Sequence, residues 1–542
     1  MEAWSFTLIS IMKRIFNLII LLLAVQYAFS QGAWISDNGD GTYKNPILYA
    51  DYSDPDICRV GEDFYMTSSS FNAIPGLPIL HSKDLVNWEI INHALQPNVD
   101  PFFDIPQHGN GVWAPSIRYN NGVFYIYWGD PDRGIFMVKT EDPNGEWSAP
   151  VLVKKAYGNI DACPLWDSDG KVYLVHAFAH SRAGINCTLQ VVELTPEGDQ
   201  ILDKGKIVID GHENHPTLEG PKFYKRNGYY YIFAPAGGVP TGWQAVFRSK
   251  NIYGPYEDKI VLAQGQTVIN GPHQGGLVEL DNGESWFVHF QDKDAYGRIV
   301  HLQPVSWVDD WPIMGTQNSE GISEPVLVYS KPNLKIQAIS VPQTSDNFED
   351  DKLGPQWQWS ANPRPHWFSL SEKPGSLVLR AIPVPVGRTN LWMVPNILTQ
   401  KLPAPSFMFT SKVDISNLRK DEETGVLVFG LDYAGISLEK SDNDIVVKQI
   451  QCIQADRGLF PETNEKVSLE DSNEFWLKIT VSNGYSTFQY STNGKQYLSL
   501  GSKFKLREGK WVGAKLGLYS TRQQTTGISG SAEYDWVRIE KN

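Results

Sequence analysis

The sequence has 542 residues, which is long for a single domain, so two or more domains are expected. Its formal net charge of −14 at pH 7 argues against a nucleic-acid-binding protein, which needs a basic surface. The chain has 42% hydrophobic residues, with 18 Trp, 24 Tyr and 24 Phe, so it can bury a large core; the aromatic content favours β structure and sugar-binding or interface surfaces.

Residues 1–30 have the pattern of an export signal. Lys13 and Arg14 precede an apolar run at 15–25, and Ala28-Phe29-Ser30 gives a small-x-small cleavage site. The alternative is a membrane anchor, but the run is short for a span of about 20 residues. We expect an exported protein, periplasmic or extracellular in a bacterium, with no stable membrane span after cleavage.

The cysteines do not indicate a disulfide framework. Cys58, Cys163, Cys187 and Cys452 are too few and too scattered for one in a chain of this length, and no CxxC pair indicates structural zinc. One incidental disulfide stays open.

A tight turn followed by an aromatic strand recurs five times in the first 290 residues. The clearest copy is Asn227-Gly228 before 229–233, because Asn-Gly between apolar alternations is a strong hairpin signal. The key aromatic residues lie 48 to 60 positions apart; they are Tyr65, Tyr125, Tyr173, Tyr231 and Trp286. A period near 50 residues is typical of propeller blades. The copies predict a five-bladed β-propeller over residues 31–328.

A polar or aromatic residue precedes each turn at a similar distance. Trp113, Asp161 and Glu219 each lie nine positions before the turn glycine, while Asp54 lies seven and His273 ten before it. The inner strands of a propeller converge on one axial cavity, so equivalent strand ends should gather three carboxylates, an indole and an imidazole. A single acid before a turn is usually only a turn residue, but random acids would seldom fall in register three times.

The remaining chain is β-rich but lacks the repeated turn. The pattern lapses over 329–344, as in a linker, and residues 345–542 contain alternating strands and Asn-Gly turns. Strands such as 376–380, 475–481 and 533–539 predict a β-sandwich. The chain is therefore predicted to be all-β, with a five-bladed propeller followed by a sandwich.

Carboxylates that face one another across a cavity are suited to glycoside hydrolysis. One carboxyl group gives its proton to the leaving oxygen, and another stays ionised as base or nucleophile. A third can raise the pKa of the acid by repulsion between like charges. Asp56, two positions after Asp54, would share its face in a strand, but the register favours Asp54.

Four motifs together resemble glycoside hydrolase family 43. They are Asp54-Pro55-Asp56-Ile57, Trp113-Ala114-Pro115, Asp161 before Pro164-Leu165-Trp166, and Glu219-Gly220-Pro221. The resemblance covers about 45–325 and implies a five-bladed propeller that acts mainly on plant polysaccharides containing xylose and arabinose. The remainder resembles the concanavalin-like, jelly-roll sandwich of the β-xylosidase and α-L-arabinofuranosidase branch.

The resemblance also implies roles for single residues. Asp54 would be the general base, Glu219 the proton donor, and Asp161 the residue that tunes the pKa of the acid and orients it, in a reaction that inverts the anomeric carbon. The substrate-binding residues would be Arg298 and His273, together with Trp113 and Phe71, which would either form an apolar sugar platform or serve the core. No cofactor is required and no metal is assigned, although His273 matches an axial histidine that often lies near a water or a cation such as Ca²⁺.

From the residues and the resemblance we expect an exported, exo-acting glycosidase. Its expected activity is removal of non-reducing-end α-L-arabinofuranosyl residues from hemicellulose side chains, on arabinoxylan or xyloglucan, with β-xylosidase or dual activity on xylo-oligosaccharides as the alternative. Its partner would be a plant cell-wall oligosaccharide or polysaccharide; the sequence indicates no oligomeric state. A non-catalytic carbohydrate-binding propeller with a lectin-like sandwich is the alternative of another class, but it has no need of three converging carboxylates.

The role of the sandwich has two interpretations. It binds polysaccharide, or it packs on the propeller and closes one side of the pocket. The short linker favours packing, and the resemblance implies that a sandwich loop helps to form the wall of the active site.

Overall fold

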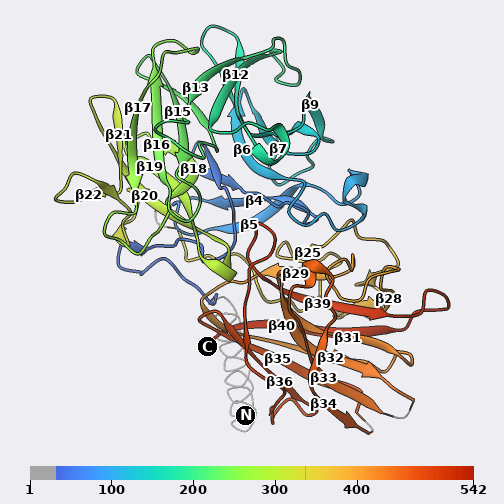
Figure 1. The fold of residues 1–542 in the computed structure, drawn as a ribbon. Coiled ribbons are helices and arrows are strands. Elements are labelled where there is room, and N and C mark those ends of the chain that lie inside the picture. Colours follow the sequence, from blue (N-terminus) through green and yellow to red (C-terminus); the bar gives the residue numbers. More distant parts are fainter. Residues whose placement is uncertain (1–31, 336, 443, 471) are drawn as a thin grey trace, which may run out of the picture.

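The computed structural model describes residues 32–335, 337–442, 444–470 and 472–542. In Figure 1 these residues form a propeller in the upper part and a sandwich in the lower part, so the predicted all-β fold is confirmed. The predicted export signal lies outside the described residues. Within the described ranges, no helix is long and apolar enough to span a membrane. The short helical turns are η1 (Pro101–Asp104), α2 (His180–Ala183), η2 (Asp294–Tyr296) and η3 (Ala455–Arg457).

Five four-stranded antiparallel sheets form the propeller, each built from four consecutive strands. The first blade contains β2 (Asp56–Val60), β3 (Asp63–Thr67), β4 (Gly76–Ser82) and β5 (Glu89–Leu95). The second contains β6 (Trp113–Asn120), β7 (Val123–Asp130), β8 (Gly134–Thr140) and β9 (Val151–Lys155). The third contains β10 (Asn159–Trp166), β11 (Val172–Phe178), β12 (Thr188–Leu194) and β13 (Lys206–Asp210). The fourth contains β14 (Lys222–Arg226), β15 (Tyr229–Ala236), β16 (Trp243–Ser249) and β17 (Glu257–Ala263). The fifth contains β18 (His273–Glu279), β19 (Ser285–Asp292), β20 (Arg298–Val308) and β21 (Trp311–Met314).

The predicted turns join the first and second strands of the blades. In the second and fourth blades both turn residues have positive φ, 48° and 86° for Asn121-Gly122 and 50° and 76° for Asn227-Gly228. Two consecutive left-handed residues are what a type I′ hairpin turn requires, and Asn-Gly adopts that conformation at least cost. The local sequence therefore sets the pairing register of these strands.

The repeated aromatic residues pack between neighbouring blades. Tyr65 lies against the cluster between the first and second blades, and Trp286 belongs to the cluster between the fifth and first. The remaining three occupy the interfaces in between: Tyr125, Tyr173 and Tyr231. Each blade thus buries its faces against its two neighbours, which explains why one large aromatic residue recurs in every copy.

A strand pair ties the two ends of the propeller together. β1 (Thr42–Lys44) pairs with β24 (Val328–Ser330), and the side chain of Asn45 donates 2.8 Å hydrogen bonds to the carbonyl groups of Leu302 and Val326. The predicted linker began at residue 329, whereas the structure places 329–330 in β24, because these residues complete the pairing with β1. A two-stranded sheet of β22 (Thr316–Gln317) and β23 (Ser323–Glu324) precedes β24.

The sandwich consists of two eight-stranded sheets that enclose one core. One sheet contains β25 (Gln358–Trp359), β28 (Ile382–Pro383), β29 (Leu398–Lys401), β31 (Glu422–Phe429), β32 (Tyr433–Lys440), β33 (Ile445–Cys452), β34 (Glu462–Leu469) and β39 (Lys515–Arg522). The other contains β26 (Phe368–Ser369), β27 (Leu377–Arg380), β30 (Ser406–Asp414), β35 (Glu474–Ser482), β36 (Tyr485–Ser491), β37 (Leu498–Ser499), β38 (Phe504–Lys505) and β40 (Ser531–Lys541). In β35 every second side chain is buried, the alternation expected of a strand with one face in a core.

The sandwich packs directly on the propeller beside the first blade (Figure 1). Trp359 of β25 forms an isolated bridge with Ile74, and Asn362 hydrogen-bonds to Asp100 and Asp104 near η1. A second contact joins the turn at η2 to the sandwich, where the Ala514 N–H donates to the Ala295 carbonyl at 2.7 Å. Of the two interpretations of the sandwich, the structure therefore agrees with packing on the propeller.

All four cysteines are buried free thiols, so the incidental disulfide that the sequence left open is absent from this structure.

Candidate active site

A cavity of about 150 Å³ lies where the inner strands of the propeller begin. Its lining residues are Asp54, Phe71, Trp113, Ala114, Ile160, Asp161, Glu219, Val239, Gln274, Arg298 and Trp511. The three predicted carboxylates therefore share one cavity, as their register indicated. A cavity of about this volume holds a single six-membered ring.

The backbone around the cavity is unusually strained. Six lining residues other than glycine have positive φ: Asp54, Phe71, Ala114, Asp161, Gln274 and Trp511. The inner strands β6, β10 and β18 also carry register shifts at their cavity ends. Bulges re-aim side chains, and left-handed residues persist where the surrounding structure holds them in place. Such strain is characteristic of functional sites.

Asp54 is held by two donors. Its Oδ1 accepts a 2.8 Å hydrogen bond from the Arg298 guanidinium, and its Oδ2 accepts one of 2.6 Å from the Ser69 hydroxyl. Ser69 is itself fixed, because its Oγ accepts the Ala114 N–H at 2.7 Å. A cation and a hydroxyl that donate to the same group suit an ionised carboxylate.

Asp161 lies on the bulge of β10 and is 4% exposed. Its Oδ2 accepts the Gly220 N–H at 2.7 Å. Burial, followed by the negative charge of Glu219, raises the pKa of Asp161 to about 8. At neutral pH a carboxyl group with this pKa is mostly protonated, so Asp161 adds little negative charge beside Glu219.

Glu219 is the more accessible member of the pair. Its side chain is 37% exposed, and Oε1 lies 3.2 Å from His273 Nε2. The backbone next to it needs glycine, because Gly220 has a φ of 60° and a Cβ there would lie 2.7 Å from Cδ of Gln274. Glu219 is better placed than Asp161 to meet a substrate, since Asp161 accepts a backbone N–H and is 4% exposed.

His273 does not line the cavity, which differs from its predicted contact with substrate. The side chain is fully buried behind Glu219, and its contact is with that carboxylate. The imidazole therefore orients Glu219. The difference arises because β18 bulges at this point, so that Gln274, the next residue, faces the cavity.

The other predicted substrate-binding residues, Arg298, Phe71 and Trp113, all line the cavity. Burial opposes the charge on Arg298, but the charges of Asp54, Asp292 and Asp51 outweigh it and raise the pKa of the guanidinium. The rings of Phe71 and Trp113 meet edge to face, with centroids 6.2 Å apart. They form an apolar part of the cavity wall.

Trp511 completes this wall from the sandwich. Its ring centroid lies 6.4 Å from that of Trp113 in an edge-to-face arrangement, and the residue is 51% exposed. Gly109 brings the propeller loop close enough for the contact, since a Cβ there would lie 3.0 Å from Cδ1 of Trp511. No sequence signal predicted Trp511 as a cavity residue, and only the neighbouring His273 pointed toward Gln274.

The family models match both parts of the chain. Residues 43–312 match glycosyl hydrolases family 43, and residues 345–540 match the β-xylosidase C-terminal concanavalin A-like domain. A provisionally named β-xylosidase of Xylanibacter ruminicola is 39% identical over 492 residues, which are 90% of this chain and 87% of the relative.

The chain belongs to glycoside hydrolase family 43.

Other family 43 proteins align with most of this chain. A non-reducing end α-L-arabinofuranosidase of Bacteroides ovatus is 30% identical over 554 residues, covering 97% of this chain and 98% of the relative. The crystal structure of a family 43 protein from Bacillus licheniformis superposes with a TM-score of 0.81 at 28% identity, covering 92% of this chain and 100% of that one. The recognition of the family from its motifs is therefore confirmed.

In this family 43 chain the alternative acid, Asp56, lies away from the cavity. It is fully buried on the propeller axis, where Oδ2 accepts from Arg118 at 2.6 Å and lies 3.9 Å from Lys222 Nζ. Asp56 is thus committed to a buried ion network. Asp54, the residue that the register favoured, is the one that faces the cavity.

The axis beneath the cavity holds buried polar atoms that no described residue satisfies. They are Asp56 Oδ1, Thr67 Oγ1, Ser68 Oγ and His273 Nδ1. Ordered water or an ion normally satisfies such atoms. Among the residues that the structure describes, no three His, Cys, Asp or Glu side chains converge as metal ligands. These polar atoms fit water, or a cation such as Ca²⁺ that is held mainly through water.

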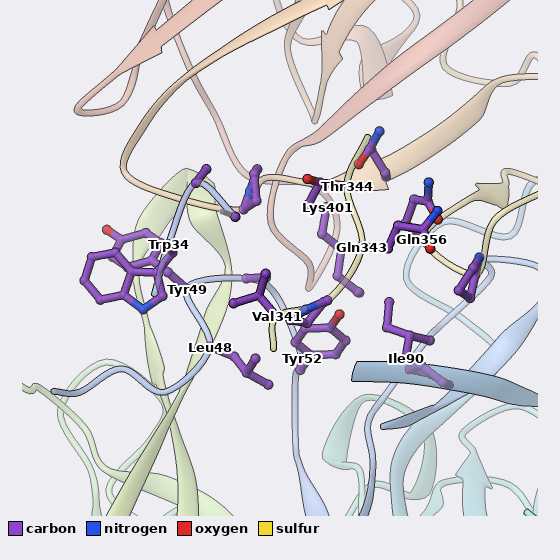
Figure 2. A pocket seen from close by; sticks show the side chains of 18 of the residues that line it. Trp34, Leu48, Tyr49, Tyr52, Ile90, Val341, Gln343, Thr344, Gln356 and Lys401 are labelled. Atoms are coloured by element: carbon purple, nitrogen blue, oxygen red, sulfur yellow. The ribbon is translucent and has the colours of Figure 1, made fainter. Parts of the chain in front are cut away.

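A second pocket, shown in Figure 2, lies between the propeller and the sandwich. It has a volume of about 60 Å³, and its walls come from the N-terminal segment, the linker and β29. Lys401 points into it, with Nζ 5.0 Å from the ring centroid of Tyr52. No Asp or Glu occurs among its lining residues, so this pocket lacks the carboxyl pair that glycoside hydrolysis requires.

Proposed function

We propose that this family 43 enzyme is an exo-acting β-xylosidase that releases single xylosyl residues from the non-reducing ends of xylo-oligosaccharides. The observation that carries the proposal is the placement of Asp54, Asp161 and Glu219 in one small cavity closed by aromatic rings. The choice of xylose rests on the relatives, which mostly carry β-xylosidase names. It reverses the order of preference drawn from the sequence.

Cleavage of α-L-arabinofuranosyl residues from hemicellulose is the second candidate. It is favoured by the Bacteroides ovatus relative of that name, which aligns over 97% of this chain. Xylose and arabinofuranose are both pentoses, and one small cavity can select either by the hydroxyl groups that it binds.

The size and the lining residues of the cavity support an exo mode of action. An endo-acting enzyme needs an open groove through which a polysaccharide chain can pass. Here Phe71, Trp113 and Trp511 enclose a space of about 150 Å³, which suits one sugar ring at a chain end. We therefore propose that the cavity binds the terminal pentose and that the rest of the substrate lies outside its mouth.

In the proposed reaction Asp54 and Glu219 act on opposite sides of the anomeric carbon. Asp54 accepts a proton from a water molecule, whose oxygen forms a bond to that carbon. The glycosidic C–O bond breaks, and its electron pair goes to the leaving oxygen, which takes the proton of Glu219. One water displacement inverts the anomeric configuration.

Asp161, His273 and Arg298 serve this step through position and charge. Asp161 lies beside Glu219 and interacts with it electrostatically, and the His273 imidazole fixes the Glu219 carboxyl group. Arg298 orients Asp54 and remains cationic. We propose no metal in the chemical step, because these groups account for both proton transfers.

The activity is tested with 4-nitrophenyl β-D-xyloside, 4-nitrophenyl α-L-arabinofuranoside and xylotetraose. We expect faster release from the xyloside, and xylose with xylotriose as the first products from xylotetraose. Xylobiose as the main first product would contradict the exo mode. If neither glycoside is cleaved, the pentosidase proposal is wrong.

A further inference from the structure

Gln274 is a buried polar residue in the cavity wall whose side chain has no partner. It is 3% exposed, it lines the cavity together with Glu219 and Arg298, and Nε2 is buried without a hydrogen bond. An amide left unpaired in this way is costly, and nearly all buried polar side chains in proteins are satisfied. A polar group of a molecule bound in the cavity, which Gln274 lines, would supply the missing partner.

The backbone holds Gln274 in this position at some cost. Its φ is 38°, which is unfavourable for a residue other than glycine, and it is the extra residue at the bulge between His273 and Gly275. The side chain packs against Gly220, where a Cβ would lie 2.9 Å from its Oε1. The amide is therefore held beside the segment that carries Glu219. In the same segment, the Gly220 N–H donates to Asp161.

The chemistry of the cavity defines what can bind this amide. Three carboxyl groups line the space, so an anionic ligand would be repelled. A carboxamide both donates and accepts hydrogen bonds without charge, which matches an alcohol hydroxyl. A neutral polyol that enters this cavity would place a hydroxyl against Gln274.

We propose that Gln274 is a specificity-determining residue, whose amide hydrogen-bonds one ring hydroxyl of the terminal pentose. This inference rests on the proposed function and adds to it the group that recognises the sugar. A site built to bond a hydroxyl discriminates strongly against an analogue that lacks it, because the buried amide is then left unpaired. Gln274 thus selects the configuration of one ring carbon.

The test compares Gln274→Met with Gln244→Met. Methionine keeps the length of the side chain but removes the amide. Gln244 lies in β16, is 1% exposed and is absent from the cavity lining, so its variant controls for loss of a buried glutamine. We expect kcat/KM of Gln274→Met on the preferred pentoside to fall about 10- to 100-fold per folded enzyme, the effect of one unmade buried hydrogen bond. The control should stay within about twofold.

Monodeoxy analogues of the preferred glycoside then separate recognition from general damage. For one analogue, kcat/KM of the wild-type enzyme should fall below its value on the parent glycoside by a factor similar to the effect of Gln274→Met. The variant should show almost the same kcat/KM on that analogue as on the parent glycoside. If Gln274 has a purely structural role, kcat/KM of the variant should be lower by the same factor on the parent glycoside and on every deoxy analogue. The loss caused by removing each hydroxyl group would then be the same in the variant as in the wild-type enzyme. That result, or a variant within twofold of wild type on both pentosides, would overturn the proposal. A wild-type enzyme that cleaves neither pentoside would instead overturn the proposed function.

Discussion

The carboxylate of Asp51, in the propeller, accepts a hydrogen bond of 3.0 Å from the backbone N–H of Gly513, in the sandwich. Its other oxygen accepts the Arg298 N–H at 2.9 Å and the Ser53 hydroxyl at 2.8 Å. One side chain, 4% exposed, therefore joins the strand that presents Arg298 to the loop that carries Trp511. We therefore expect the geometry of the cavity to depend on this contact between domains.

Replacing Asp51 with Ala should disturb the cavity and the domain contact together. Burial, followed by the charge of Lys401, lowers the pKa of Lys515 to about 8, and Asp51 is the carboxylate that opposes this shift. Loss of the Asp51 carboxylate leaves three donors unpaired: the Gly513 and Arg298 backbone N–H groups and the Ser53 hydroxyl. Each buried unpaired group lowers the free energy of unfolding by about 1–3 kcal/mol. We expect a lower melting temperature and a fall of about 10-fold in kcat/KM. Asp281→Ala, at an exposed ion pair with Arg59, is the control and should change neither quantity. Unchanged activity of Asp51→Ala would show that the contact does not shape the cavity.

Trp511→Ala should weaken substrate binding more than the chemical step. Its ring lines the cavity against Trp113 and carries no group that takes part in proton transfer. Removing an aromatic wall of this kind costs about 0.5–1.5 kcal/mol beyond buried area. We expect KM to rise about 10-fold while kcat stays within about threefold. Phe460→Ala, at a sandwich residue that is 73% exposed, is the control. An unchanged KM would mean that Trp511 does not wall the sugar site.

The alkaline limb of the pH–rate profile should report the carboxyl pair. Burial, followed by the negative charge of Glu219, raises the pKa of Asp161 to about 8, so Asp161 becomes charged beside the proton donor as the pH rises through about 8. Asp161→Asn removes the repulsion between the two groups. Because the variant has no titrating group at position 161, the limb near pH 8 should be lost from its kcat/KM profile. A limb that stays in place would exclude this coupling.

Removal of metal ions should leave the rate unchanged. The proton transfers are assigned to Asp54 and Glu219, and the unpartnered atoms on the axis fit water or a cation held through water. After dialysis against EDTA we expect kcat within about twofold of the untreated enzyme, whatever the effect of added Ca²⁺ on the melting temperature. Loss of kcat that Ca²⁺ restores would contradict this assignment.

Most of the propeller and its carboxylates could be predicted because the signals are local and repeated. The turn glycines set the strand register, and one aromatic residue per copy fills an interface between blades. Aligning the copies was then enough to place Asp54, Asp161 and Glu219 at equivalent strand ends.

The missed features depend on tertiary structure. Trp511 reaches the cavity only through the packing of the sandwich on the propeller, and it belongs to no repeat. Gln274 faces the cavity in place of the predicted His273 because a one-residue bulge reverses the direction of successive side chains. Sequence alternation alone does not reveal such a bulge.

The role of Glu219 as proton donor is tested most directly by its dependence on the leaving group. Glu219→Gln cannot protonate a sugar oxygen, whereas 4-nitrophenolate leaves with little need for a proton. Glu213→Gln, at an exposed acid in the preceding loop, is the matched control. We predict that kcat of Glu219→Gln on xylobiose falls about 10²- to 10⁴-fold, with a much smaller loss on 4-nitrophenyl β-D-xyloside. Equal losses on the two substrates, or full activity on xylobiose, would contradict the account.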